Sequence, residues 1–154
     1  MKYGLPHVPE SLVGPLPEGM PLLRYRGFFD GGARSNGAAT QGAAGAGAVF
    51  FDRDKVLFSA RLPLGRETNS VAENRASVLL LRGILRVEED LEPNEEIGIY
   101  GDNTTSVRNL NGEVAVVTRH ENRVSAAAAT TLVTELRLLR TVRPGHLTDT
   151  PTGS

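Results

Sequence analysis

The sequence predicts a mixed α/β fold, in which helices pack on the faces of one sheet, and three observations lead to this prediction. From residue 25 onward, three short apolar segments are joined by turn-forming residues, as in an antiparallel meander. An amphipathic helix pattern follows the third segment. Another strand pattern, two helices and the start of a last strand complete the chain. Strands mixed with helices in this order favour a single mixed sheet.

The first three strands are expected at residues 25–30, 46–51 and 56–62. The first of them ends in Asp30. Residues 31–47 are rich in glycine and alanine, and this composition predicts a turn-laden loop into the second strand. The polar residues 52–55 form the turn before the third strand, whose residues partly alternate between apolar and polar.

Helical spacing of apolar residues predicts the first long helix between Val71 and Leu85. Thr68, Asn69 or Ser70 can cap this helix. Glu73 lies three residues after Ser70, which fits a capping box. Capping is therefore the structural role open to Glu73. The acidic residues 88–96, which include a proline, are expected to form a linker.

The second half of the domain begins with a strand at residues 97–102, which ends in Asp102. Residues 103–110 form a short helix, and a long helix runs from about 120 to 140. Residues 141–142 begin a fifth strand, and the pair Pro144-Gly145 is expected to break or end it.

Composition limits the classes of protein that fit. The chain has 154 residues, 40% of them hydrophobic, a formal net charge of -1 and no cysteine. Disulfides, thiolate zinc sites and a cysteine nucleophile are excluded. No apolar run reaches the length of a membrane helix, and no signal or transit peptide is evident. We expect a soluble intracellular protein, with its compartment left open.

Three regions are expected. Residues 1–24 hold five of the nine prolines and form an extended arm. The arm has apolar residues with which to dock, either on its own domain or on a protein partner. Residues 25–147 form the domain, and residues 148–154 form a flexible polar tail.

Three acids stand where chemistry is expected. Asp30 and Asp102 each end an apolar strand beside glycines, and Glu73 lies at the start of a helix. If the first and fourth strands are neighbours, the two aspartates lie side by side, and a helix that crosses the sheet can bring Glu73 to them. Clustered carboxylates repel one another unless a cation is bound, and such oxygen ligands suit Mg²⁺ or Mn²⁺. The alternative is ordinary, because such aspartates form turns and such glutamates support helix starts.

The segments around these acids resemble, in order, the motifs of the type I ribonuclease H family. The resemblance lies in residues 28–37 (FFDGGARSNG), 68–76 (TNSVAENRA) and 97–107 (IGIYGDNTTSV), and it extends over residues 25–147. It implies a five-stranded mixed sheet, three antiparallel strands followed by parallel additions, flanked by helices. It also implies two-metal cleavage of the RNA strand of RNA–DNA hybrids, with no membrane insertion.

By the same resemblance, Asp30, Glu73 and Asp102 are the catalytic residues and bind two Mg²⁺ or Mn²⁺ ions. Asn36 and Asn69 take the places of polar side chains near the RNA strand, where a turn residue and a helix cap are the alternatives. His146 follows Pro144-Gly145 as an auxiliary histidine does in the family.

The sequence departs from the family in three ways. It ends at Ser154 without the closing helix and its fourth acid. Asp149 either substitutes for this fourth acid or is part of a surface turn. It lacks a basic, aromatic-rich segment, and the glutamates of residues 88–96 repel a nucleic acid if they face it. The alternative function is therefore a non-catalytic domain of this fold in a larger assembly, with a partner on the arm or on the open C-terminal edge. A chance resemblance in an unrelated α/β domain is the third possibility.

Overall fold

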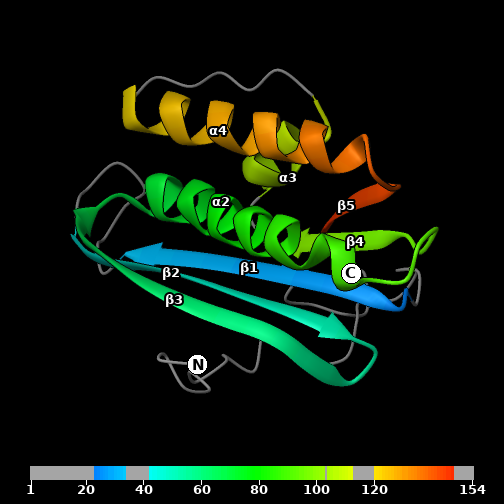
Figure 1. Ribbon diagram of the computed structural model, residues 1–154. Helices are drawn as coiled ribbons and strands as arrows, with labels where there is room; N and C mark the ends of the chain where they lie inside the picture. The colour runs from blue at the N-terminus through cyan, green and yellow to red at the C-terminus, as the bar shows by residue number, and fades with distance from the viewer. Residues whose placement is uncertain (1–22, 34–41, 103, 113–119, 148–154) are drawn as a thin grey trace, which may run out of the picture.

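The architecture is a single mixed sheet of five strands, as a computed structural model of the chain describes for residues 23–33, 42–102, 104–112 and 120–147. The strand order is β3-β2-β1-β4-β5 (Figure 1). β1 (Tyr25–Ala33), β2 (Gly42–Asp52) and β3 (Lys55–Glu67) pair antiparallel. β4 (Ile97–Gly101) and β5 (Val142–His146) are added in parallel beyond β1. The mixed sheet predicted from the sequence is confirmed.

The described helices all lie over the same face of this sheet (Figure 1). They are α2 (Asn69–Val87), the short 3₁₀ helix η1 (Glu88–Asp90), α3 (Thr104–Leu110) and α4 (His120–Arg137). α2 packs on β1 and β2, and α4 packs on α2 as an outer layer. None of the helices in these ranges combines the length and the apolar character that a transmembrane segment needs.

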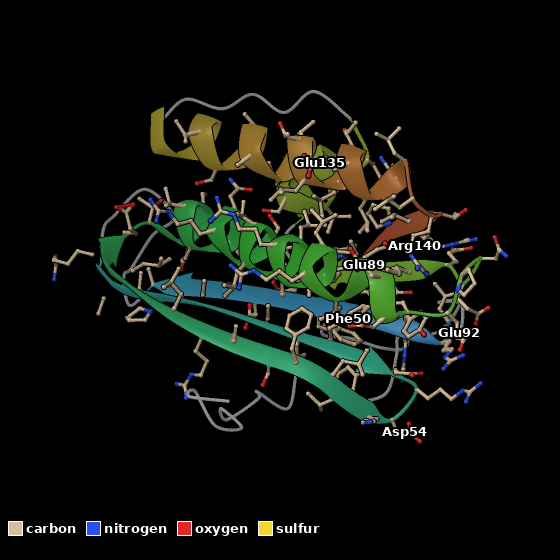
Figure 2. The ribbon with its side chains drawn as sticks, viewed as in Figure 1. Phe50, Asp54, Glu89, Glu92, Glu135 and Arg140 are labelled. Atoms are coloured by element: carbon tan, nitrogen blue, oxygen red, sulfur yellow. The ribbon has the colours of Figure 1, made fainter. Side chains whose placement is uncertain are left out.

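The main core fills the space between α2, α4 and the sheet. Phe29, Phe50, Leu80 and Leu136 are fully buried in it, and Phe50 lies between the sheet and α2 (Figure 2). The ring of Phe50 stacks on Tyr25 with centroids 6.0 Å apart. A second, smaller cluster lies on the opposite face of the sheet, because successive strand residues point to opposite sides. This second cluster consists of Phe28, Val49, Phe51 and Tyr100.

The prediction of a loop over residues 31–47 is wrong for its described parts. β1 continues to Ala33, and β2 begins at Gly42, so that Gly32 pairs with Gly45 and Ala33 with Ala44. The low strand propensity of glycine and alanine is overridden because β2 is hydrogen-bonded to strands on both sides. Asp30 therefore lies within β1, beyond the last residue of β1 that pairs with β4.

Pro144-Gly145 does not break the last strand, which runs from Val142 to His146. Among the described strands, β5 lies at the edge of the sheet and pairs with β4 alone. An edge strand tolerates a proline, because it has no second neighbour to which an N–H must donate. Pro144 pairs with Ile99 in the parallel register. The continuation of β5 places His146 beside Gly101, at the end of β4 where Asp102 follows.

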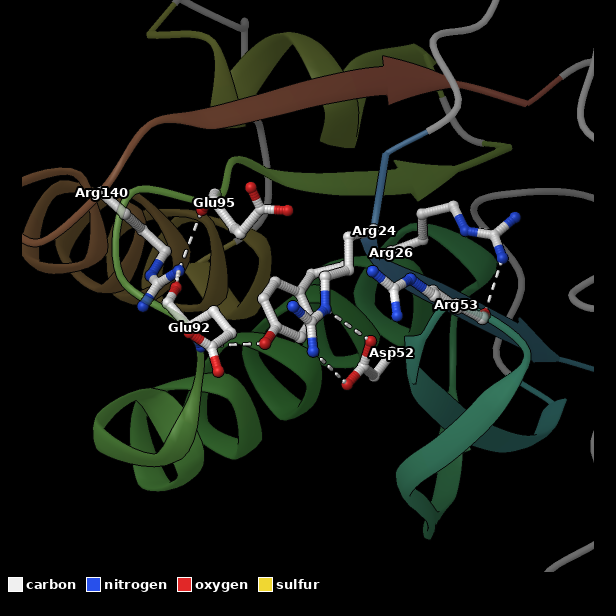
Figure 3. Close-up of polar contacts among 8 residues, drawn as sticks. Arg24, Arg26, Asp52, Arg53, Glu92, Glu95 and Arg140 are labelled. Atoms are coloured by element: carbon white, nitrogen blue, oxygen red, sulfur yellow. Dashed lines mark hydrogen bonds and ion pairs between the residues drawn. The ribbon is translucent and has the colours of Figure 1, made fainter.

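The acidic linker is held by one arginine. Arg140 is 8% exposed and forms an ion pair with Glu88 at 2.8 Å. It also donates hydrogen bonds to the backbone carbonyls of Glu92 and Glu95 (Figure 3). The linker comes before β4 and Asp102 comes directly after β4. The linker and Asp102 therefore lie at opposite ends of this strand, which is about 16 Å long. The glutamates of the linker therefore do not crowd the three acids.

Candidate metal centre

The site is built where α2 lies directly on β1. Gly31 makes this approach possible, because a β-carbon there would lie 2.1 Å from the backbone oxygen of Ala72 and 2.5 Å from the backbone nitrogen of Glu73. The side chain of the next helical residue, Glu73, is thus brought beside Asp30. The close packing of two backbones is the main reason why these two acids meet.

The third acid reaches the same point from β4. β4 is parallel to β1 and ends at Gly101, where a β-carbon would lie 2.3 Å from the ring of Phe29. Asp102 follows immediately and is exposed. One carboxylate oxygen from each of Asp30, Glu73 and Asp102 lies within 4.8 Å of the other two. The structure thus brings together the three acids that the sequence analysis selected.

Glu73 is the buried member of this cluster, with 7% of its surface exposed. Burial raises the pKa of Glu73 to about 9, with further contributions from the charges of Asp102 and Asp30 and from a hydrogen bond to Asp102. A hydrogen bond from the backbone N–H of Gly31 partly opposes this rise in pKa. The Oε2 atom of Glu73 is buried and has no hydrogen-bond partner among the described residues. Such an orphaned acceptor is costly unless a proton or a cation satisfies it.

Glu73 does not act as a capping residue. The N-cap of α2 is Thr68, whose side chain accepts a hydrogen bond from the backbone N–H of Val71 at 3.2 Å. The proposed capping box, which needs Ser70 as the N-cap, is therefore wrong. Capping of α2 therefore does not explain why the carboxyl group of Glu73 is buried beside two other carboxyl groups.

Asn69 connects the two elements that carry the acids. It is the first residue of α2, and its Oδ1 accepts a hydrogen bond of 2.6 Å from the backbone N–H of Ala33 in β1. Asn69 is not the cap of α2. Its observed contact is structural, and contact with a substrate stays a prediction.

His146 is an exposed neighbour of the cluster. Its Nε2 lies 2.9 Å from the backbone oxygen of Asp102. This contact follows from the register of β5 with β4, which the sequence alone did not predict beyond residue 142. Asn36 and Asp149, the other two predicted site residues, lie outside the described residues.

Sequence reasoning missed a pair of polar residues behind the acids. Asn74 follows Glu73 in α2, and its Oδ1 accepts a hydrogen bond of 2.9 Å from the hydroxyl of Ser106 in α3. Both side chains are buried. This bond ties the start of α3, just after Asp102, to the turn of α2 that carries Glu73. The sequence signal was available, because both residues lie inside the second and third motif segments.

The three acids fit a divalent cation. They supply only oxygen ligands, which Mg²⁺ and Mn²⁺ prefer, and one of these oxygens, Oε2 of Glu73, is buried with no hydrogen-bond partner in the part of the chain that the structure describes. Like charges at such separations repel one another, and a cation relieves that repulsion.

Metal-free protein is expected to lose stability as the pH rises from 5 to 8. The folded-state pKa of Glu73, about 9, lies above its ordinary value of 4.5, so between these values the folded state holds a proton that the unfolded state has released. The free energy of unfolding then falls as pH rises, by about 3 kcal/mol at pH 7 for this one group. Urea unfolding at several pH values measures this fall in the free energy of unfolding. Glu73→Gln should make the free energy of unfolding depend less on pH.

The matched control for this measurement is Glu135→Gln, on the exposed side of α4 (Figure 2). This variant should keep the full pH dependence. An unchanged slope in Glu73→Gln would contradict the assignment. Added Mg²⁺ should remove the loss above pH 7 in the parent chain and in Glu135→Gln but not in Glu73→Gln, because a bound cation replaces the proton.

The fold is shared with ribonuclease H domains, and on this ground the chain has a ribonuclease H-like fold. The N-terminal RNase H domain of a Mycobacterium tuberculosis protein, determined as a fusion with maltose-binding protein, is 25% identical, with a TM-score of 0.67 over 83% of this chain and 84% of that one. An RNase H1 isolated from compost by a metagenomic approach is 25% identical, with a TM-score of 0.66 over 83% of this chain and 86% of that one.

A third similar structure is the RNase H1 of the halophilic archaeon Halobacterium salinarum, at 23% identity and a TM-score of 0.64, over 82% of this chain and 86% of that one. The compost enzyme has also been solved in complex with an RNA/DNA hybrid. No family model and no curated protein sequence matches the chain. The fold class is therefore established by three-dimensional similarity.

Proposed function

We propose that this chain is a metal-dependent endonuclease that hydrolyses the RNA strand of RNA–DNA hybrids. The observation that carries the proposal is the convergence of Asp30, Glu73 and Asp102 from three separate elements, with carboxylate oxygens within 4.8 Å of one another. The fold supports it, because a similar structure is that of an RNase H1 bound to an RNA/DNA hybrid. Oε2 of Glu73 is buried with no hydrogen-bond partner among the described residues, which is difficult to explain in a purely structural domain.

Asp30, Glu73 and Asp102 would hold two Mg²⁺ or Mn²⁺ ions. Such a pair activates a water and stabilises the leaving oxygen in phosphodiester hydrolysis. Within the protein, Asp102 and Asp30 supply the more accessible carboxylates, and Glu73 supplies an oxygen shielded from water. Asp149 remains a candidate for a fourth carboxylate.

The neighbouring polar residues have positioning and recognition roles in this proposal. Asn69 and Asn36 would contact the RNA strand, where a 2′-hydroxyl distinguishes RNA from DNA. His146 contacts the backbone of Asp102 and is exposed, so its ring would lie beside the substrate bound at the three acids. Asn74 and Ser106 keep α2 and α3 in register behind the acids.

The test is cleavage of a labelled RNA–DNA hybrid by the purified chain, with Mg²⁺ and separately with Mn²⁺. RNA-strand cleavage is expected with either metal and none in EDTA. Asp30→Asn should remove it. Asp54→Asn, in the exposed turn between β2 and β3, is the matched control and should keep it (Figure 2).

Substrate specificity is read in the same assay. Duplex DNA and duplex RNA should not be cut. Folded protein that cleaves no hybrid with either metal would overturn the proposal and leave the non-catalytic domain as the function. Cleavage that survives Asp30→Asn would show a contaminating nuclease.

A further inference from the structure

An apolar groove of about 270 Å³ is open on the outer side of α2, which lies between α4 and β3 (Figure 1). Its lining comes from three elements. They supply Arg75, Val78, Leu79 and Arg82 from α2, Val124 and its neighbours from α4, and Leu62 from β3.

The groove is separate from the three acids. Arg75 lies two residues after Glu73 in α2, and two residues turn a helix by about 200°. Glu73 is buried toward β1, so the groove lies on the opposite side of the same helix. A molecule bound in the groove would therefore not occupy the site of Asp30, Glu73 and Asp102.

The floor of the groove is aliphatic and reaches the surface. Leu62 is 40% exposed and Val124 is 55% exposed. The other exposed large apolar side chains among the described residues are Leu138 and Leu139, which lie beyond the end of α4. Exposed apolar side chains that gather around a hollow, unlike single scattered ones, mark a binding surface.

The size of the groove favours side chains of a protein over a free small molecule. Sites that enclose drug-sized ligands have volumes of roughly 300 to 1,000 Å³ and bury most of the ligand. This groove is smaller, and its exposed Leu62 and Val124 leave it open to solvent. It has room for a few aliphatic side chains of a larger partner.

Two positive charges border the aliphatic floor. Arg75 and Arg82 are both exposed, and within the described ranges neither forms a hydrogen bond or an ion pair. They lie seven residues apart on α2, which is two turns or about 10 Å along the helix axis. None of the described residues that line the groove is acidic. A partner that fills the groove therefore meets two arginines available for pairing.

We propose that this groove is a docking site for an acidic amphipathic helix of a protein partner. Aliphatic side chains of that helix fill the space over Leu62, Leu79 and Val124, as in other complexes in which a helix lies in a groove. Two of its carboxylates, about two turns apart, pair with Arg75 and Arg82. The spacing matches because two helices laid side by side have the same rise per residue.

The floor of the groove distinguishes this partner from a nucleic acid. Surfaces that bind a nucleic-acid strand combine cations with aromatic side chains on which bases stack. The described lining here has arginines but no aromatic ring. Phosphates would also leave the aliphatic surface between Arg75 and Arg82 uncovered.

The test is selection of peptides of about 16 residues, long enough for four helical turns, from a phage-displayed random library on the full chain. The enriched peptides should combine aliphatic residues with Asp or Glu at helical spacing. Their affinity, measured by fluorescence anisotropy, should fall by about tenfold or more with Arg75→Glu and Arg82→Glu together. Leu62→Asp should have a similar effect. Peptides whose acids are replaced by lysine should prefer the double arginine variant to the parent chain.

The matched control is Arg61→Glu, because Arg61 is exposed beside Leu62 in β3 but does not line the groove. This variant should keep the affinity, and the Tm of every variant is compared with that of the parent chain. The absence of enriched peptides, enrichment without acidic residues, or equal affinity for the parent and the double arginine variant overturns the proposal.

Two other occupants give different results in solution. A dimer of the chain that Leu62→Asp dissociates would assign the groove to a second copy. Weaker binding of an RNA–DNA hybrid in EDTA by the double arginine variant would assign the arginines to nucleic acid. Either result overturns the proposal, and none of these readouts depends on nuclease activity.

Discussion

Asp102→Asn is expected to abolish hybrid cleavage while making the metal-free protein more stable. The exposed carboxylate of Asp102 is one of the three proposed ligand groups, so its loss should lower the cleavage rate by more than the roughly 100-fold that loss of a group behind a metal ligand can cost. Glu73 holds a proton in the metal-free protein at neutral pH, so the repulsion that is relieved is the one between Asp102 and Asp30, and its relief should raise the free energy of unfolding by about 1 kcal/mol. The hybrid assay and urea unfolding in EDTA measure the two effects.

Asp102→Asn should lower the cleavage rate and raise the free energy of unfolding, and this combination distinguishes a lost ligand from misfolding. A variant that is inactive because it is misfolded loses both activity and stability. A variant that lacks only a metal ligand loses activity but keeps or gains stability in the absence of metal. Mg²⁺ should raise the Tm of the parent chain but not of Asp102→Asn, because a ligand stabilises only the state that binds it. Full activity in Asp102→Asn, or equal stabilisation of both proteins by Mg²⁺, would contradict the assigned site.

The local patterns in the sequence predicted where each acid lies in its own element, but their convergence was predicted only on the condition that the first and fourth strands are neighbours, as the resemblance to ribonuclease H implies. Asp30 and Asp102 come after apolar strands, and Glu73 opens a helix with clear periodicity. The parallel pairing of β1 with β4 and the packing of α2 on β1 complete the arrangement. Local patterns thus located the elements and their order favoured a mixed sheet, whereas the parallel addition of the fourth strand was implied by the resemblance.

Strand boundaries depended on pairing that no local pattern reveals. Residues 42–47 have little strand propensity, yet they form part of β2 because two neighbouring strands hydrogen-bond to them. Pro144 lies within β5 because that strand is at an edge. In both places tertiary context overrode the signals of glycine and proline.

The raised pKa of Glu73 could not be predicted from the sequence. The pattern around Glu73 indicated a helix start, where a carboxylate is normally exposed. The burial that raises its pKa depends on how closely α2 approaches β1. Likewise, the contact of His146 with Asp102 depends on the register of β5. Functional detail in this protein therefore arises from distances between elements that are far apart in the chain.

Gly31→Ala is expected to be the most damaging single-atom addition in the domain. Its β-carbon would overlap the backbone of Ala72 and Glu73, at 2.1 Å from the Ala72 oxygen, and a backbone cannot move aside as a side chain can. α2 must shift as a whole, at a cost of about 3 kcal/mol or more. The shift separates Glu73 from Asp30, so stabilisation by Mg²⁺ and hybrid cleavage should both be lost.

The adjacent glycine supplies the control for this prediction. Gly32 is exposed, and a β-carbon there meets nothing within 4 Å. Gly32→Ala should leave cleavage intact and keep or slightly raise the Tm, because alanine loses less conformational freedom than glycine in a strand. Thermal unfolding with and without Mg²⁺ compares the pair. Equal behaviour of the two variants would mean that α2 can move away from β1 at little cost, and that the approach of their backbones does not hold the three acids together.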